Sequence, residues 1–139
     1  MTAYVDASVI LRLALGQANA LTEWSKIQRG VSSALIKTES LRTLDRLRLR
    51  AQLSDAEVAT RQAAILSLVD SLEVVEIDMA VLDRASQPMP TELGTLDAIH
   101  LATALLWKES TGLEITIATH DEALGLGAKA HGLPVVGVG

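Results

Sequence analysis

Apolar and polar positions along the chain switch between two spacings, so strands and helices are expected to alternate. The run TAYVD is apolar up to its final acid, and SVILRLAL soon after it repeats apolar residues at helical spacing. Similar short apolar runs precede helical patterns further along. The predicted strands lie at 2–6, 31–33, 71–78, 113–119 and 133–138, and the predicted helices at 8–15, 34–53, 54–70, 79–86, 95–107 and 122–132.

Two of the helical patterns meet at SDAE, where Ser54 and Glu57 have the spacing of a capping box, in which each side chain bonds the other residue's backbone N–H. Ile65 and Val69 continue the second pattern at a helical interval. The sequence therefore predicts a helical hairpin between the second and third strands. By contrast, QPMPTELG contains two prolines and a glycine, and it predicts a loop before the helix that contains Asp97.

Strands that are apolar almost throughout, alternating with helices, are typical of a parallel sheet covered by helices on both faces. The predicted fold is a three-layer α/β/α domain that spans residues 1–139 as one unit and carries the helical hairpin as an insertion. In such sheets ligands bind beyond the carboxyl ends of the strands. The functional residues are therefore sought at that edge.

Composition narrows the classes of function. The chain has no cysteine, so a metal ion would need oxygen or imidazole ligands. A net charge of −5, with two tryptophans, one tyrosine and no phenylalanine, argues against binding nucleic acid through bulk charge or base stacking. No apolar run reaches the roughly 18 residues of a membrane span and no signal peptide is evident, so we expect a soluble, cytoplasmic protein without a membrane partner.

Four acids fall where the predicted fold places the carboxyl edge of the sheet. Asp6 ends the first strand, and Asp121 follows the fourth. Glu39 lies early in the helix after the second strand, and Asp97 begins the helix after the proline-containing loop. Carboxylates that converge raise one another's proton affinity unless a cation neutralises them. Oxygen ligands favour Mg²⁺ or Mn²⁺, and such a site suits phosphodiester hydrolysis.

Each acid taken alone has an ordinary structural interpretation. Asp6 and Asp121 could cap helices, and Asp97 could favour the positive end of its own helix. Glu39 could be a solvated helix residue. His100, three residues after Asp97 in an apolar helix, is interpreted as a packed, hydrogen-bonded residue that at most supports the site. Only the convergence of all four acids favours a metal site.

Further polar residues are candidates for supporting or binding roles. Ser8 and Thr119 each lie within two residues of one of the acids. Arg42, Arg46 and Arg50 are spaced by four on the helix of Glu39, and they form either a solvated face or a track for RNA phosphates.

Four stretches of the chain together resemble a known family. YVDASVIL, SSALIKTESLRTL, LGTLDAIHLATAL and ATHDEALGLGAKAHGLPVVGV resemble the PIN-domain family, and within it the VapC-type toxins of bacterial and archaeal toxin–antitoxin pairs. The likeness spans essentially the whole chain, and LDAIHLATAL followed by THD is its most specific part. The proline-broken segment before Asp97 departs from many relatives, whose chain is helical there.

The resemblance implies a Mg²⁺- or Mn²⁺-dependent endoribonuclease whose acidic quartet is Asp6, Glu39, Asp97 and Asp121. It also implies a sheet order of 3-2-1-4-5, a homodimer, and inhibition by a small VapB-type antitoxin whose tail covers the acidic pocket. In this hypothesis the three aspartates bind the main ion, while Glu39 orients water or helps to hold a second ion. Cleavage would leave a 5′-phosphate and a 3′-hydroxyl.

Two other functions stay open at this point. A catalytically silent PIN-like module would keep the fold and act through a protein partner, with the acids serving only as caps. A receiver-type phosphoacceptor domain also uses acids at this edge and would have Asp78 as its acceptor. Against the receiver, Asp6 has no adjacent acid, and the region of the last strand has no suitable lysine.

Overall fold

The protein, described here over residues 1–138 by a computed structural model, is built on a five-stranded parallel sheet. The strands are β1 (Thr2–Val5), β2 (Arg29–Ser33), β3 (Glu73–Val75), β4 (Thr116–Ala118) and β5 (Val135–Val136). Their spatial order is β3-β2-β1-β4-β5. This order confirms the predicted 3-2-1-4-5 arrangement and leaves β1 in the centre of the sheet.

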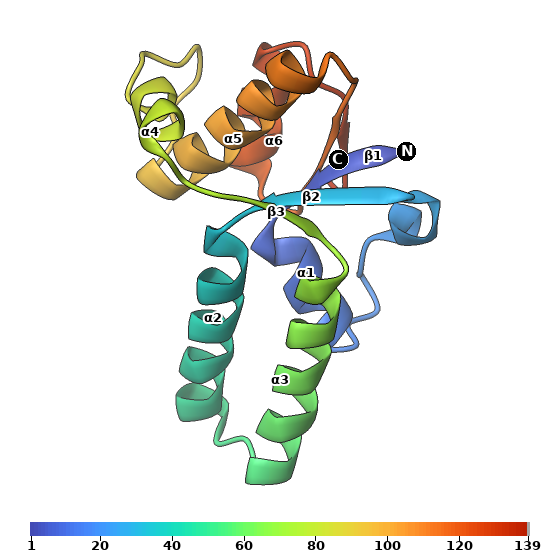
Figure 1. Cartoon of the computed structure of the whole chain (residues 1–139). Helices are drawn as coiled ribbons and strands as arrows, with labels where there is room; N and C mark the ends of the chain where they lie inside the picture. Colours follow the sequence, from blue (N-terminus) through green and yellow to red (C-terminus); the bar gives the residue numbers. More distant parts are fainter. Residues whose placement is uncertain (139) are drawn as a thin grey trace.

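Helices cover both faces of the sheet (Figure 1). One face carries α1 (Ala7–Ala14), α2 (Leu35–Ala51) and α3 (Asp55–Asp70), and the other carries α4 (Met79–Ala85), α5 (Thr95–Thr111) and α6 (Glu122–Ala130). The predicted three-layer α/β/α fold is therefore confirmed. Within residues 1–138, no helix combines the length and the hydrophobicity needed to cross a bilayer.

Strand β1 is buried on both faces because its side chains alternate between two hydrophobic cores. Ala3 and Val5 pack into the core formed with α1, α2 and α3. Tyr4 points the other way, into the core formed with α5 and α6. This double burial explains why the strand is apolar throughout rather than alternating between apolar and polar residues.

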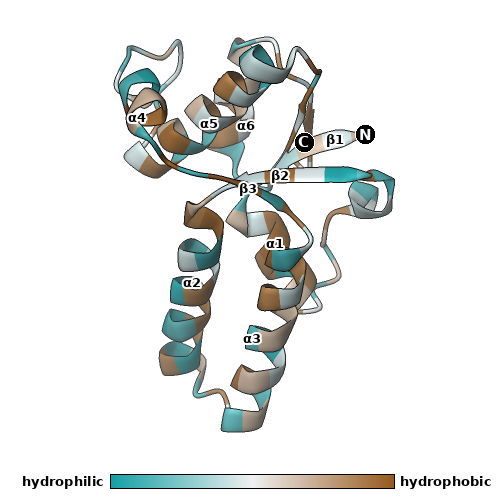
Figure 2. Cartoon of the chain, viewed as in Figure 1, coloured by the Kyte–Doolittle hydropathy of each residue, from teal (hydrophilic) through white to brown (hydrophobic). Residues whose placement is uncertain are grey.

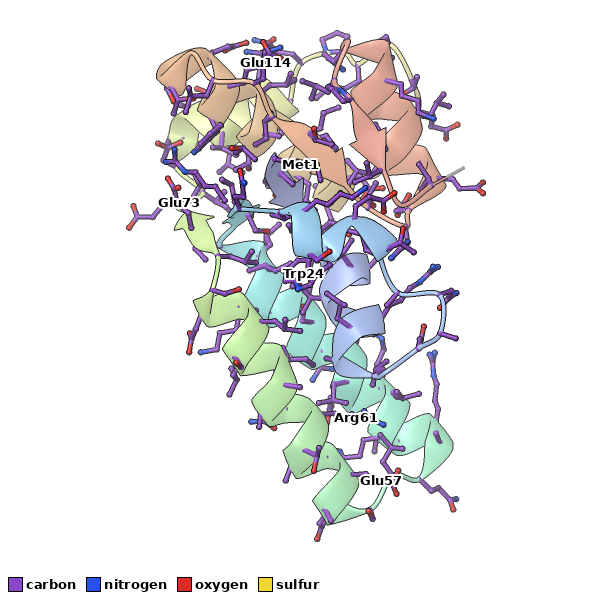
Figure 3. All side chains as sticks on the ribbon, turned by 90° about the vertical axis from the view of Figure 1, so that its right-hand side faces the viewer. Met1, Trp24, Glu57, Arg61, Glu73 and Glu114 are labelled. Carbon is purple, nitrogen blue, oxygen red and sulfur yellow. The ribbon has the colours of Figure 1, made fainter. Side chains whose placement is uncertain are left out.

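The predicted helical hairpin is formed by α2 and α3, which extend together well beyond the sheet (Figures 1 and 3). The capping box is present: Ser54 Oγ accepts the N–H of Glu57 at 3.1 Å, and Glu57 Oε1 accepts the N–H of Ser54 at 3.4 Å. Nearer the sheet, Arg61 of α3 donates to the carbonyl oxygen of Ala14 at 3.1 Å, which ties the hairpin to the end of α1. Figure 2 shows hydrophilic residues on each turn of α2 after its hydrophobic first turn.

Some predicted element boundaries are wrong. The pattern predicts a strand over 71–78, but β3 covers only three residues, and Asp78 instead caps α4 by accepting the N–H of Val81 at 3.0 Å. Strand β5 is likewise shorter than its apolar run, and β2 begins earlier than predicted, at Arg29. Strand β4 is also shorter than predicted, covering Thr116–Ala118 rather than 113–119, so the shortening is not confined to the edge strands β3 and β5. A 3₁₀ helix over Thr22–Lys26 was not predicted.

Candidate active site

The four acids all lie at the carboxyl edge of the sheet. Asp6 directly follows β1 and caps α1, and Asp121 follows the neighbouring strand β4 and caps α6. Glu39 is in the second turn of α2, and Asp97 is in the first turn of α5. The capping interpretation is thus correct for Asp6 and Asp121, but capping does not explain why acids from four separate segments meet at one edge.

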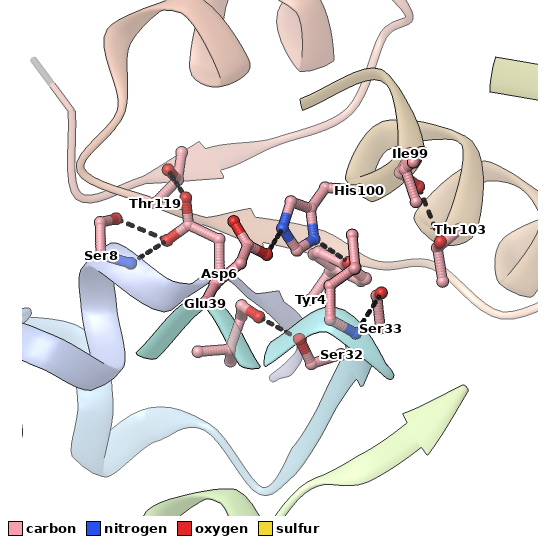
Figure 4. Close-up of polar contacts among 12 residues, drawn as sticks. Tyr4, Asp6, Ser8, Ser32, Ser33, Glu39, Ile99, His100, Thr103 and Thr119 are labelled. Carbon is pink, nitrogen blue, oxygen red and sulfur yellow. Dashed lines mark hydrogen bonds and ion pairs between the residues drawn. The ribbon is translucent and has the colours of Figure 1, made fainter. Parts of the chain in front are cut away.

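Asp6 is held in one orientation by hydroxyl groups from both flanking segments (Figure 4). Ser8 Oγ donates to Asp6 Oδ1 at 2.5 Å, and Thr119 Oγ1 donates to Asp6 Oδ2 at 2.5 Å. The same hydroxyl oxygens accept backbone N–H groups, Ser8 from His120 at 2.8 Å and Thr119 from Asp121 at 2.9 Å. These bonds tie the carboxylate of Asp6 to the backbone that carries Asp121.

Glu39 is held from the other side of the sheet. His100 Nε2 lies 2.5 Å from Glu39 Oε1, and His100 Nδ1 lies 2.5 Å from the hydroxyl of Tyr4. His100 is only 2% exposed, so it is the packed, hydrogen-bonded residue that the sequence indicates. Its contact with Glu39 and the presence of Tyr4 behind it were not predicted. The available signal was a single tyrosine in an otherwise aliphatic strand, two residues before Asp6.

The acids repel one another electrostatically. The pKa of Asp97 is raised to about 6, first by burial and then by the negative charges of Asp121, Asp6 and Glu39. Burial also raises the pKa of Asp6, although the hydroxyl donors Ser8 and Thr119 lower it. Burial and neighbouring acids both make these carboxyl groups costly to ionise, and a bound cation would offset that cost.

The donor chemistry of this cluster fits a hard divalent cation, because every acid offers carboxylate oxygens. Across residues 1–138, however, no three acidic or histidine side chains already form a ligand set. Several of their oxygens accept hydrogen bonds instead, such as Asp121 Oδ1 from the N–H of Leu124 at 3.1 Å. The residues therefore fit an ion in charge and ligand type, and binding would require some of these side chains to reorient.

The three arginines predicted as RNA contacts are exposed on α2. Arg42 pairs with Asp45 at 3.1 Å, and Arg46 and Arg50 follow at intervals of four residues. All three share a side of the helix with Glu39, because four residues correspond to slightly more than one helical turn. The stripe thus leads from the acidic edge toward the tip of the hairpin.

Comparison with known proteins identifies the family. A PIN-domain model matches residues 3–126. This chain belongs to the PIN-domain family. The PIN-domain chain is also 34% identical to "Ribonuclease VapC46" of Mycobacterium tuberculosis, over 137 residues that cover 96% of this chain and 95% of that protein.

Solved structures share the PIN fold at much lower identity. The structure of FitAB bound to an IR36 DNA fragment superposes with a TM-score of 0.71 at 16% identity, covering 97% of this chain and 93% of the other. A toxin–antitoxin complex from Klebsiella pneumoniae gives a TM-score of 0.68 at 16% identity, covering 96% and 95%. At such identities the likeness establishes the architecture alone.

Proposed function

We propose that the chain is a metal-dependent endoribonuclease, the toxin component of a type II toxin–antitoxin system. The observation that carries this proposal is that Asp6, Glu39, Asp97 and Asp121 lie at one edge of the sheet, where burial and the charges of the other three acids raise the proton affinity of Asp97. The 34% identity to "Ribonuclease VapC46" over nearly the whole chain supports RNA as the substrate.

Mg²⁺ or Mn²⁺ is the proposed cofactor, held by Asp6, Asp97 and Asp121 with help from Glu39. When bound, such an ion lowers the pKa of water and stabilises the charge on the phosphate oxygens. Thr119 and Ser8 would keep the carboxylate of Asp6 directed at the site, since their hydroxyls fix both of its oxygens. Glu39 would orient the attacking water or help to hold a second ion.

The substrate would lie across the acidic edge, with its backbone along α2. Arg42, Arg46 and Arg50 are the proposed RNA-binding residues, because exposed guanidinium groups on the side of Glu39 can pair with successive phosphates. Hydrolysis would leave a 5′-phosphate and a 3′-hydroxyl.

A VapB-type antitoxin is the proposed protein partner, and a homodimer the proposed assembly, acting in the cytoplasm. One solved structure that shares the fold is named as a toxin–antitoxin complex, from Klebsiella pneumoniae, and another is named as VapBC-1, from nontypeable Haemophilus influenzae. Exposed apolar residues support a protein-binding surface: Leu96, beside Asp97, is 49% exposed, and Met79 at the start of α4 is 68% exposed.

The test is cleavage of mixed cellular RNA by the purified protein, with Mn²⁺ or Mg²⁺ and with chelator, beside the Asp97→Asn variant. We expect fragments with 5′-phosphates from the wild type with metal, and none with chelator or from the variant. Equal cleavage by Asp97→Asn would reject the assignment. A folded wild type that cleaves no RNA with either ion would favour the catalytically silent alternative.

A further inference from the structure

Three side chains from three elements form a continuous hydrogen-bonded series that ends at the acidic edge (Figure 4). Tyr4 comes from the central strand β1, His100 from α5 and Glu39 from α2. Both bonds of the series measure 2.5 Å between heavy atoms. The rings of Tyr4 and His100 also pack edge to face, with centroids 5.7 Å apart and planes at 69°. Because Tyr4 is fully buried and His100 nearly so, packing restricts the movement of both rings.

The chemistry of the partners sets the direction of these hydrogen bonds. An ionised carboxylate only accepts, so His100 Nε2 carries the hydrogen that it donates to Glu39 Oε1. In a neutral imidazole the other nitrogen is then an acceptor, and His100 Nδ1 receives the hydroxyl hydrogen of Tyr4. The carboxylate of Glu39 thus sets the tautomer of His100, and the hydroxyl of Tyr4 donates to the ring nitrogen that remains an acceptor.

The other two histidines provide an internal contrast. His120 Nδ1 lies 2.9 Å from the carbonyl oxygen of Gly137, and His131 Nδ1 lies 3.0 Å from the carbonyl oxygen of Gly127. A carbonyl oxygen only accepts, so both of these rings carry their hydrogen on Nδ1. Of the three histidines in the sequence, His100 is therefore expected to have the opposite tautomer.

We infer that Tyr4 and His100 are positioning residues that hold Glu39 in its working orientation at the acidic edge. This inference rests on the proposed ribonuclease function. A glutamate side chain loses rotamer entropy when it is fixed, and the series fixes Glu39 before substrate arrives. Since α2 and α5 lie on opposite faces of the sheet, the series also ties the two helical layers together at the site.

Tyr4→Phe is the informative variant, because it keeps the buried ring and removes only the hydroxyl. Without that donor, His100 Nδ1 loses its hydrogen bond, so the ring is held less firmly in the orientation in which Nε2 donates to Glu39. We expect kcat for RNA cleavage to fall about tenfold, as for other losses behind a metal-site residue, with KM unchanged. In a Glu39→Gln background, Tyr4→Phe should cause no further loss.

The matched control is Thr103→Val. Thr103 is also fully buried, and its hydroxyl donates to the carbonyl oxygen of Ile99 within α5, away from the series. This variant should leave kcat and the tautomer of His100 unchanged. If Tyr4→Phe folds poorly, His100→Gln and His100→Leu replace it: glutamine keeps an N–H donor for Glu39 and should retain more activity than leucine.

A second readout does not depend on activity. Imidazole ¹⁵N NMR of the metal-free protein at pH 8 should show one Nε2–H ring and two Nδ1–H rings. Tyr4→Phe should keep the Nε2–H pattern of His100 and shift its Nδ1 resonance, because that nitrogen loses its hydrogen-bond donor. Three Nδ1–H rings in the wild type would overturn the inference even if the protein proves not to be a ribonuclease. Wild-type cleavage that Tyr4→Phe leaves intact, or effects of Tyr4→Phe and Glu39→Gln that simply add, would overturn it while the proposed function stands.

Discussion

The amino and carboxyl edges of the sheet, where the parallel strands begin and end, differ in the arrangement of their charged side chains. At the amino edge, Arg29 of β2 pairs with Glu73 of β3 at 2.9 Å, and its guanidinium carbon lies 5.1 Å from the centre of the Trp107 ring. At the carboxyl edge acids face acids, and the pKa of Asp97 rises to about 6. The amino edge thus pairs a positive with a negative side chain, whereas the carboxyl edge gathers negative side chains.

The requirements of folding account for the charged residues at the amino edge, but not for those at the carboxyl edge. Both edges belong to the same strands, so the architecture does not itself demand a cluster of acids. A paired arginine and glutamate add modestly to stability, whereas clustered carboxylates reduce it. Groups that cost stability are typical of functional sites, which is why the carboxyl edge is the one to test.

The largest contrast should come from removing one acid at each edge. Asp6→Asn should lower kcat/KM for RNA at least about 100-fold, or about 2.7 kcal/mol, because the substituted side chain loses the charge that attracts the ion. Glu73→Gln should leave cleavage within about twofold and lower the melting temperature slightly, as expected for an exposed pair. Steady-state kinetics and thermal unfolding measure both. Comparable losses of activity at the two edges would mean that the acidic edge has no special role.

A smaller effect should appear in the stability of the metal-free protein. The pKa of Asp97 in the folded state, about 6, lies above its usual 3.8, so the folded state binds the proton more tightly than the unfolded state. The contribution of Asp97 to stability is therefore fully present below about pH 4, is lost as the pH rises from 4 to 6, and then stays constant. Asp97→Asn should remove this loss and, after allowance for solvent screening, stabilise the protein at pH 8 by about 1 kcal/mol, or roughly 3–5 °C.

Thermal unfolding in chelator across that pH range checks the sign. Saturating Mn²⁺ should reverse the ranking at pH 8, because the ion stabilises the wild type more than the variant. A wild type whose stability rises between pH 4 and 6 while the Asp97→Asn curve stays flat would contradict the repulsion between the acids.

The smallest effect concerns the arginine stripe that leaves the acidic edge. Arg46→Gln should raise KM for RNA about two- to threefold and weaken its dependence on salt, with kcat unchanged, since one exposed phosphate contact is lost. Arg48→Gln is the matched control, because Arg48 is equally exposed on α2 but lies off the stripe, where it pairs with Asp45 at 2.9 Å. An equal rise in KM for both variants would point to general charge rather than to a track.

Local patterns were sufficient to predict much of the fold and the position of the acids. Asp6 and Asp121 end apolar runs, and parallel strands place such residues at one edge, so their neighbourhood followed from the fold class. The capping box at Ser54 depends on residues only three apart, and it too was predicted correctly. The short edge strands were not, because the length of β3 depends on pairing with β2 rather than on its own residues.

The spacing of apolar and polar residues did not predict contacts between segments that are distant in the sequence. Tyr4 and His100 are 96 residues apart, and nothing near either residue indicates that the two rings meet. The pairing of Arg29 with Glu73 beside Trp107 likewise depends on how β2, β3 and α5 pack. Such contacts are fixed by tertiary geometry, so sequence spacing gives no direct signal for them.

Each of the four carboxylates sits on a different stretch of chain, and none of those stretches holds more than one of them. The group of four acids therefore forms only when β1, α2, α5 and α6 have all packed together. An incomplete chain, or one in which any of these segments is unfolded, lacks at least one of the four carboxylates at the site. Any chemistry that needs all four carboxylates is thus a property of the fully folded chain alone.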